Sequence, residues 1–129
     1  MIGTLVDSDV LIWYLRGNPK AKEAIETLGP FAISCVTHME LVQGMRDKRE
    51  LRLFQQTLKQ WQTKTIYISE EISARALFYV EEYFLSHSMQ LADALIAATA
   101  TTHGLTLLTA NDKHYRIVQE LDLTLFRPA

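Results

Sequence analysis

The chain has 129 residues, of which 48% are apolar and 22% charged. These values predict one globular domain over residues 1–129 and exclude a disordered or fibrous protein. No apolar stretch approaches the ~20 residues of a membrane span, no basic leader precedes Asp7, and the single cysteine, Cys35, excludes an internal disulfide. We therefore expect a cytoplasmic domain without a membrane segment.

The net charge of −2 conceals an uneven distribution of charge along the chain. Residues 44–64 contain six basic and two acidic side chains, a balance of +4, whereas the remaining residues carry −6. A basic segment beside an acidic remainder fits a metal-holding site next to a phosphate-binding surface. A solvated helix face is the alternative explanation of the same charges.

In the first half of the chain, short apolar runs alternate with amphipathic stretches. Runs rich in apolar, β-branched and aromatic residues predict strands at Thr4–Val6, Phe31–Ser34 and Thr65–Ile68. Helical spacing and capping or breaking residues predict helices over Val10–Leu15, over Lys20–Leu28, from Thr37 onward and over Asp47–Trp61.

The second half repeats this alternation of helices and strands. Ser69 caps a long helix, and an alanine-rich helix over Leu91–His103 ends at Gly104. A strand, a helix and a final edge strand follow, over Leu105–Thr109, Asp112–Leu121 and Leu123–Phe126. Strands separated by helices predict an α/β fold with a parallel sheet covered by helices.

Acidic and amide side chains follow two of the predicted strands. Asp7 and Asp9 come directly after the first strand, and Asn111 and Asp112 come after the strand that ends at Thr109. Ligands of open parallel sheets bind beyond the carboxyl ends of the strands. The alternative is structural, since such side chains also cap helices and form turns.

Two further carboxylates lie at predicted helix starts. Glu40 follows Thr37 in the spacing of a capping box, which is a sufficient structural explanation. Asp93 lies in a helix of small and apolar residues that should be largely buried, and it has no basic residue three or four positions away. A buried carboxylate needs a partner, either the positive end of its helix or a metal ion.

Considered together, the four places could face one edge of the parallel sheet. Converging carboxylates repel one another and require a cation. Their donor atoms are all oxygen, with no histidine or cysteine at metal-ligand spacing, which favours Mg²⁺ or Mn²⁺ over Zn²⁺. Such an ion lowers the pKa of a bound water and stabilises charge on phosphate oxygens, so the pattern favours phosphoryl chemistry.

The same segments carry a family resemblance, which extends over essentially the whole chain. They read Leu5-Val6-Asp7-Ser8-Asp9-Val10-Leu11, Ile33-Ser34-Cys35-Val36-Thr37-His38-Met39-Glu40-Leu41, Leu91-Ala92-Asp93-Ala94-Leu95-Ile96-Ala97-Ala98-Thr99-Ala100 and Gly104-Leu105-Thr106-Leu107-Leu108-Thr109-Ala110-Asn111. In order and spacing they resemble the PIN-domain ribonucleases, specifically the VapC-type toxins of type II toxin–antitoxin pairs.

The resemblance implies a three-layer α/β/α fold with a central, mainly parallel sheet. It also implies Mg²⁺-dependent cleavage of RNA, often transfer RNA, with Mn²⁺ as a substitute ion. Its metal-binding acids map onto Asp7, Glu40 and Asp93, and its polar helpers onto Thr37 and Thr109. A toxin further implies a cognate antitoxin that binds helices near the site and masks it, with assembly as a homodimer or as a hetero-oligomer with the antitoxin.

The chain departs from the family pattern at two places. Asp9 stands where the family commonly has Asn, which adds a charge near the metal. In the last motif Asn111 fills the first polar position, and His114, before Tyr115, stands where the family usually has an acid. Asp112 is the candidate substitute for that fourth catalytic acid.

Because the acids repel a polyanion, RNA affinity must come from cations outside the pocket. We expect Arg46, Lys48, Arg49 and Arg52 to bind RNA phosphates. Two other functions compete with the ribonuclease: a PIN-fold module with weak or no catalysis that binds a protein partner, and a small phosphatase suggested by Asp7-Ser8-Asp9 after a strand. The missing acid supports the first, but no lysine follows a later strand in the context that the second requires.

Overall fold

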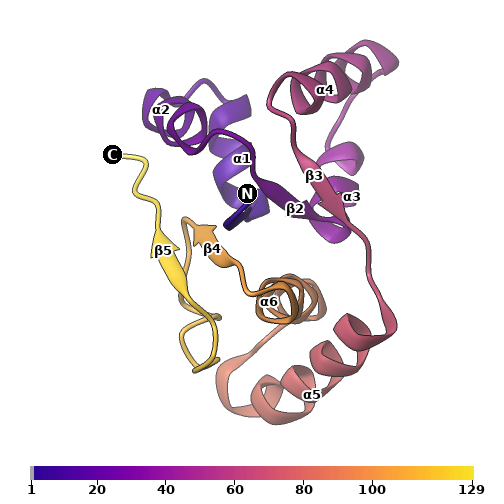
Figure 1. The fold of residues 1–129 in the computed structure, drawn as a ribbon, viewed down its shortest axis with the longest axis vertical. Helices are drawn as coiled ribbons and strands as arrows, with labels where there is room; N and C mark the ends of the chain where they lie inside the picture. The colour runs from indigo at the N-terminus through magenta and orange to yellow at the C-terminus, as the bar shows by residue number, and fades with distance from the viewer. Residues whose placement is uncertain (1) are drawn as a thin grey trace.

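The computed structural model describes residues 2–129, which form a five-stranded sheet in which every neighbouring pair is parallel (Figure 1). The strand order is β3-β2-β1-β4-β5. The strands are β1 (Thr4–Val6), β2 (Ala32–Ser34), β3 (Lys64–Ile66), β4 (Thr106–Thr109) and β5 (Leu123–Leu125). This sheet confirms the predicted α/β class and the parallel arrangement of the strands.

Six helices cover the two faces of the sheet and complete the predicted three-layer α/β/α arrangement. They are α1 (Ser8–Leu15), α2 (Pro19–Leu28), α3 (Cys35–Gln43), α4 (Lys48–Gln60), α5 (Glu70–His87) and α6 (Leu91–His103). Side chains alternate between the faces of a strand. Accordingly, Leu5 packs in the core beneath α5 and α6, whereas Val6 packs in the core beneath α1, α2 and α4.

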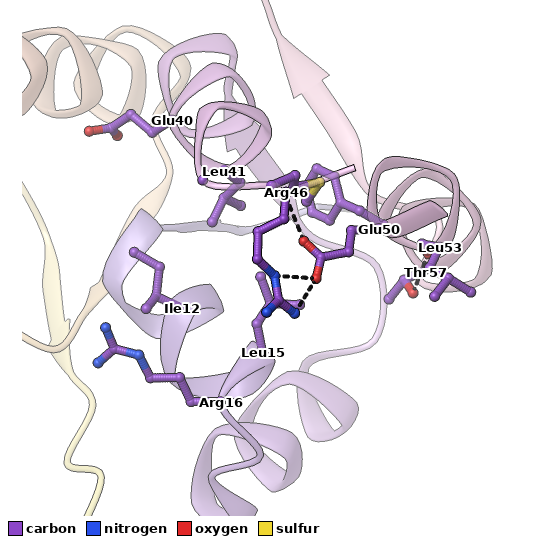
Figure 2. Close-up of a pocket in the computed structure, with 12 residues that line it drawn as sticks. Ile12, Leu15, Arg16, Glu40, Leu41, Arg46, Glu50, Leu53 and Thr57 are labelled. Carbon is purple, nitrogen blue, oxygen red and sulfur yellow. Dashed lines mark hydrogen bonds and ion pairs between the residues drawn. The ribbon is translucent and has the colours of Figure 1, made fainter. Parts of the chain in front are cut away.

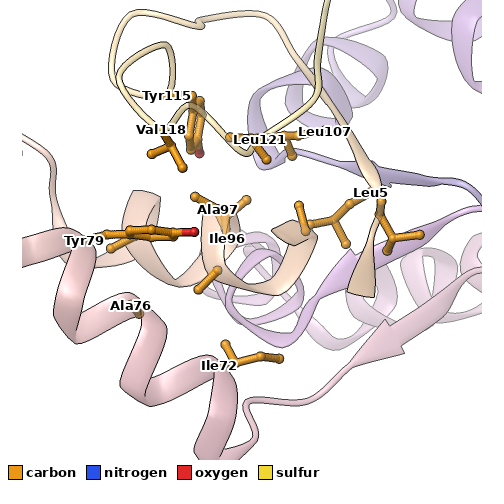
Figure 3. Close-up of a cluster of buried hydrophobic side chains, with 14 of the residues drawn as sticks. Leu5, Ile72, Ala76, Tyr79, Ile96, Ala97, Leu107, Tyr115, Val118 and Leu121 are labelled. Atoms are coloured by element: carbon orange, nitrogen blue, oxygen red, sulfur yellow. The ribbon is translucent and has the colours of Figure 1, made fainter. Parts of the chain in front are cut away.

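The larger core forms around α6, which Figure 1 shows between the strands and α5. Small residues such as Ala97 let the helix lie close to its neighbours, and Tyr79, Ala76 and Ile72 of α5 line the facing side (Figure 3). Because α6 is buried against both the sheet and α5, its first turn, which carries Asp93, is held at the carboxyl end of the sheet. Among residues 2–129, no helix is long and apolar enough to cross a membrane.

The capping box predicted at Thr37 and Glu40 is wrong. Helix α3 begins two residues earlier, at Cys35, and the Ser34 side chain caps it by accepting a hydrogen bond from the Val36 backbone N–H at 3.1 Å. Ser34 ends a strand and therefore has the extended backbone that an N-cap residue needs. Thr37 and Glu40 consequently lie inside the helix, where their side chains are free to face other elements.

The helix predicted over Asp112–Leu121 is also wrong, because this segment is a series of turns. Backbone bonds link residues three apart: the Tyr115, Val118 and Leu121 N–H groups donate to the carbonyls of Asp112, Tyr115 and Val118. The side chains of Tyr115, Val118 and Leu121 all enter the core above α6 (Figure 3). Apolar residues spaced three apart are compatible with this turn series as well as with a helix. For this reason the sequence pattern predicts a helix.

The hydroxyl of Tyr79 makes partly buried polar contacts at the edge of this core. It donates to Glu120 Oε1 at 2.5 Å and lies 3.0 Å from Thr101 Oγ1, which ties α5 to the segment before β5. Tyr79→Phe should lower the free energy of unfolding in urea by about 1–2 kcal/mol. Tyr83→Phe is the matched control, since no described residue bonds to that hydroxyl. Equal losses in both variants would contradict this role of Tyr79.

Candidate metal centre

An acidic cavity of about 210 Å³ opens at the carboxyl end of the sheet. It lies where the chain leaves β1 and β4, which are neighbouring strands of the sheet. From β1 the chain continues to β2 on one side of this pair, and from β4 it continues to β5 on the other. Ligand sites of open α/β sheets occur at such points. The lining residues are Asp7, Ser8, Asp9, Ile12, Glu40, Ala92, Asp93, Ile96, Asn111, His114 and Tyr115. Four carboxyl groups separated by up to 86 positions in the sequence therefore share one cavity.

Asp7 is the most buried of these acids, with 6% of its surface exposed. Its Oδ1 accepts a hydrogen bond from the Ser8 backbone N–H at 2.7 Å, and its Oδ2 accepts one from the Thr109 hydroxyl at 2.9 Å. Burial and the neighbouring charge of Asp9 nevertheless raise the pKa of Asp7 to about 7. The carboxylate form of Asp7 is therefore costly in the absence of a cation.

Asp9 places a second carboxyl group beside Asp7. Both of its oxygens lie 3.1 Å from the Ala110 backbone N–H, and Oδ2 also lies 3.2 Å from the Thr109 hydroxyl. These contacts clamp the first turn of α1 to the end of β4. Burial raises the pKa of Asp9, although the bonds from Ala110 and Thr109 oppose that shift.

Glu40 is held by a residue that the sequence did not single out. The Ser8 hydroxyl donates to Glu40 Oε1 at 2.7 Å and lies 3.0 Å from Thr37 Oγ1, so that α1 and α3 are joined at the cavity. Thr37 is fully buried at this contact. Because this role of Ser8 depends on α3 packing beside α1, its position between two aspartates was the only signal in the sequence.

Asp93 and Tyr115 complete the inner wall of the cavity. Asp93, in the first turn of α6, accepts a hydrogen bond from the Gln90 backbone N–H at 3.3 Å. Tyr115 is 2% exposed and lines the cavity together with Asp7. Burial, followed by the charges of Asp7 and Asp93, raises the pKa of Tyr115, so its hydroxyl keeps its proton. The sequence placed this tyrosine beside the last motif without assigning it a function.

The structure does not bring Asp112 into the cavity. Its Oδ2 accepts a bond from Arg116 Nε at 2.5 Å, outside the set of lining side chains. Asn111 and His114 reach the cavity in its place. These positions follow from the turn series over residues 112–121. In this conformation Tyr115 is buried, His114 lies at the cavity wall, and Asp112 bonds to Arg116.

None of the four basic residues expected to bind RNA lines the acidic cavity. Arg46 lines a groove that adjoins the cavity and forms an ion pair with Glu50, at 2.7 Å between Nη2 and Oε2 (Figure 2). Lys48, Arg49 and Arg52 lie exposed on α4. These three side chains provide positive charge on α4, whereas Arg46 is partly neutralised by Glu50.

The donor set of the cavity fits a divalent cation. It comprises four carboxyl groups, the Asn111 amide and the His114 imidazole, and no lysine or arginine lines it. Within residues 2–129, no three acidic, histidine or cysteine side chains already stand close enough to hold an ion. Ligation therefore requires the carboxylates to draw inward. Burial, and after it the charge of Asp9, raise the pKa of Asp7, and a bound cation would favour the charged form of this carboxyl.

Removing the Asp7 charge should stabilise the metal-free protein. The pKa of Asp7 is about 7 in the folded protein, compared with a reference value of 3.8. The free energy of unfolding that this group contributes is therefore highest at low pH and is lost as the pH rises through 7. In chelator, urea unfolding should give a free energy that rises as pH falls from 8 to 5, by up to about 1.4 kcal/mol per unit from this group. Asp7→Asn should flatten the slope and raise stability at pH 8.

The exposed Asp122→Asn variant is the matched control for this measurement. It should keep the pH dependence of the unmodified chain. A slope that is the same in all three proteins would contradict the uncompensated burial of Asp7.

Comparison with known proteins agrees with this geometry and confirms the family resemblance. The PIN domain family matches residues 4–120. The chain is 40% identical to Ribonuclease VapC10 of Mycobacterium tuberculosis over 124 residues, covering 91% of this chain and 89% of the relative.

The chain is 30% identical to a chain of a toxin–antitoxin complex from Klebsiella pneumoniae, with a TM-score of 0.76 and 98% of each chain covered. In DNA-bound VapBC from Salmonella typhimurium a chain has the same fold, with a TM-score of 0.84 at 17% identity, covering 98% of this chain and 100% of that one. The chain therefore belongs to the PIN-domain family, where its sequence relatives are VapC ribonucleases.

Proposed function

We propose that this chain is a divalent-metal-dependent endoribonuclease that acts as the toxin of a toxin–antitoxin pair. The observation that carries the proposal is the gathering of Asp7, Asp9, Glu40 and Asp93 around one cavity that no basic side chain neutralises. The relatives named as ribonucleases support the reaction class. Mg²⁺ is the proposed ion, Mn²⁺ a substitute, and transfer RNA a candidate substrate.

Asp7, Asp93 and Glu40 would hold the ion in this cavity. When bound, it supplies a water of lowered pKa and stabilises the negative charge that develops on the phosphate oxygens. Thr109 orients Asp7 and Asp9 with one hydroxyl, and Ser8 orients Glu40. Tyr115 closes the inner wall, and burial keeps its hydroxyl protonated by raising its pKa.

The buried Asp7 makes the proposed activity dependent on pH. With a pKa of about 7, this carboxyl must lose a proton before it binds a cation. Affinity for the ion should therefore fall as pH drops below 7. Protonation of Asp7 also stabilises the fold while the site is empty. The protonated carboxyl therefore favours folding, and the carboxylate favours metal binding.

The proposed antitoxin has a groove available next to the acidic cavity. The groove has a volume of about 520 Å³ between α1, α3 and α4, with Leu15, Leu41 and Leu53 among its walls (Figure 2). Ile12 and Glu40 line both the groove and the cavity. A segment seated there would cover the approach to the acids. The toxin–antitoxin complex of the Klebsiella relative supports this proposal, while homodimer formation and a cytoplasmic location remain predictions.

The two competing functions receive less support from the site. A phosphatase with an aspartate nucleophile needs a lysine near that aspartate, yet no lysine lines the cavity. A non-catalytic binding module would not need the ordered contacts of Ser8 and Thr109 to the acids. The lack of an acid from the last motif, residues 109–115, in the cavity is the one feature that favours it.

Loss of a metal-holding acid should abolish RNA cleavage without unfolding the protein. We expect Asp7→Asn and Asp93→Asn to lower cleavage of an RNA pool by roughly 100-fold or more, and Glu40→Gln to lower it by a smaller factor. Asp112→Asn should cleave like the unmodified chain, because that carboxylate bonds to Arg116. Activity is measured at saturating Mg²⁺, with thermal unfolding as the check of folding.

The exposed Glu82→Gln variant controls for loss of an acidic charge. Full activity in folded Asp7→Asn and Asp93→Asn proteins would overturn the proposed function. Loss of activity in Asp112→Asn would restore Asp112 as the fourth acid.

The exposed cations of α4 should set the salt dependence of RNA binding. In an inactive Asp7→Asn background, each of Lys48→Ala, Arg49→Ala and Arg52→Ala should reduce the slope of log affinity against log salt by about one unit. Arg46→Ala should have a smaller effect, since Arg46 is paired with Glu50. Gln55→Ala, on the same helix, controls for side-chain loss without charge loss. An unchanged slope would assign this face to solvent or to a protein partner.

A further inference from the structure

His114 is a wall residue of the acidic cavity that the proposed reaction leaves unused. It lies in the turn series after β4, is half-buried and lines the cavity together with Asn111 and Tyr115. The other histidines do not line this cavity. The His114 ring therefore places a nitrogen donor among carboxylates, whose donor atoms are all oxygen.

The orientation of the His114 ring is restrained from the side of α5. Its Nδ1 lies 3.4 Å from the backbone carbonyl oxygen of His87, the last residue of α5. With Nδ1 as the donor to that oxygen, the tautomer leaves a lone pair on Nε2. No residue within 2–129 hydrogen-bonds to Nε2.

An imidazole held by a backbone carbonyl through one nitrogen is the usual arrangement of a metal-binding histidine. The carbonyl fixes the tautomer and the ring orientation, and it raises the basicity of the nitrogen that binds the ion. His114 reaches the cavity wall next to Tyr115, whereas Asp112 lies outside it and bonds to Arg116.

We propose that His114 supplies a nitrogen ligand, Nε2, to the divalent ion of this cavity and thereby biases the site toward Mn²⁺ over Mg²⁺. This inference rests on the proposed metal-dependent function. Mg²⁺ strongly prefers oxygen ligands and near-ideal octahedral geometry. First-row transition ions bind imidazole more readily, and their affinity for mixed nitrogen and oxygen sites rises from Mn²⁺ onward.

The direct test is electron spin echo spectroscopy of the full chain loaded with Mn²⁺ alone, which detects a nitrogen atom bound to the ion. The unmodified chain should show nitrogen modulation, and His114→Ala should lose it. His87→Ala is the matched control, because it removes a neighbouring imidazole but keeps the backbone carbonyl that restrains His114. This control should retain the signal.

Binding titrations provide the second measurement. His114→Ala should weaken Mn²⁺ binding by about tenfold and change Mg²⁺ binding by less than about threefold. If His114→Ala is unstable without metal, His114→Gln replaces it, since its amide keeps the polarity and approximate size of the side chain. Thermal unfolding in chelator shows whether His114→Ala is folded without metal, and therefore which of the two variants is compared with the unmodified chain.

The outcomes separate this inference from the proposed function. Saturable Mn²⁺ binding that Asp7→Asn abolishes, but with no nitrogen modulation in the unmodified chain, would overturn the role of His114 and leave the metal site standing. Loss of the signal in His87→Ala alone would also overturn it, because the nitrogen would then come from His87. If the unmodified chain binds no Mn²⁺, or if Asp7→Asn binds it unchanged, both the inference and the proposed metal centre fail.

Discussion

The site depends on one constraint, which is that Asp7 must be buried at the end of β1 while close to other acids. Its two oxygens are satisfied by the Ser8 N–H and the Thr109 hydroxyl, and these donors come from opposite ends of the chain. They meet because β1 and β4 are adjacent and parallel, with Val6 level with Leu108. The pairing of these two strands therefore creates both the burial of Asp7 and the contacts that make it tolerable.

Helix ends supply the remaining compensation. Helices α1 and α6 both begin at the cavity, with Asp7 as the N-cap of α1 and Asp93 in the first turn of α6. The positive ends of these helices favour carboxylates at such positions. Structural and functional explanations of Asp7 and Asp93 are thus compatible, since the same carboxyl groups can stabilise a helix start and line a cation site.

Two surfaces with different chemistry meet at Ile12 and Glu40. The acidic cavity offers charged oxygen atoms, whereas the adjoining groove between α1, α3 and α4 is lined mainly by apolar side chains. An ion and a protein segment could therefore be recognised by independent interactions a few residues apart. On the functions proposed above, this proximity is a physical basis for inhibition, because a segment in the groove would cover the route to the acids.

The sequence by itself determined the α/β class, the parallel sheet and most of the element positions, because periodicity and capping act over a few residues. It also identified Asp7, Asp9, Glu40, Asp93 and Asn111 as candidates, and these side chains line one cavity. Only the tertiary structure decided that Ser34 rather than Thr37 caps α3, and that residues 112–121 form turns. It likewise decided that Ser8 and Tyr115 join the site while Asp112 stays outside. Those outcomes depend on which elements pack side by side, and contacts between residues up to about a hundred positions apart leave no local pattern in the chain.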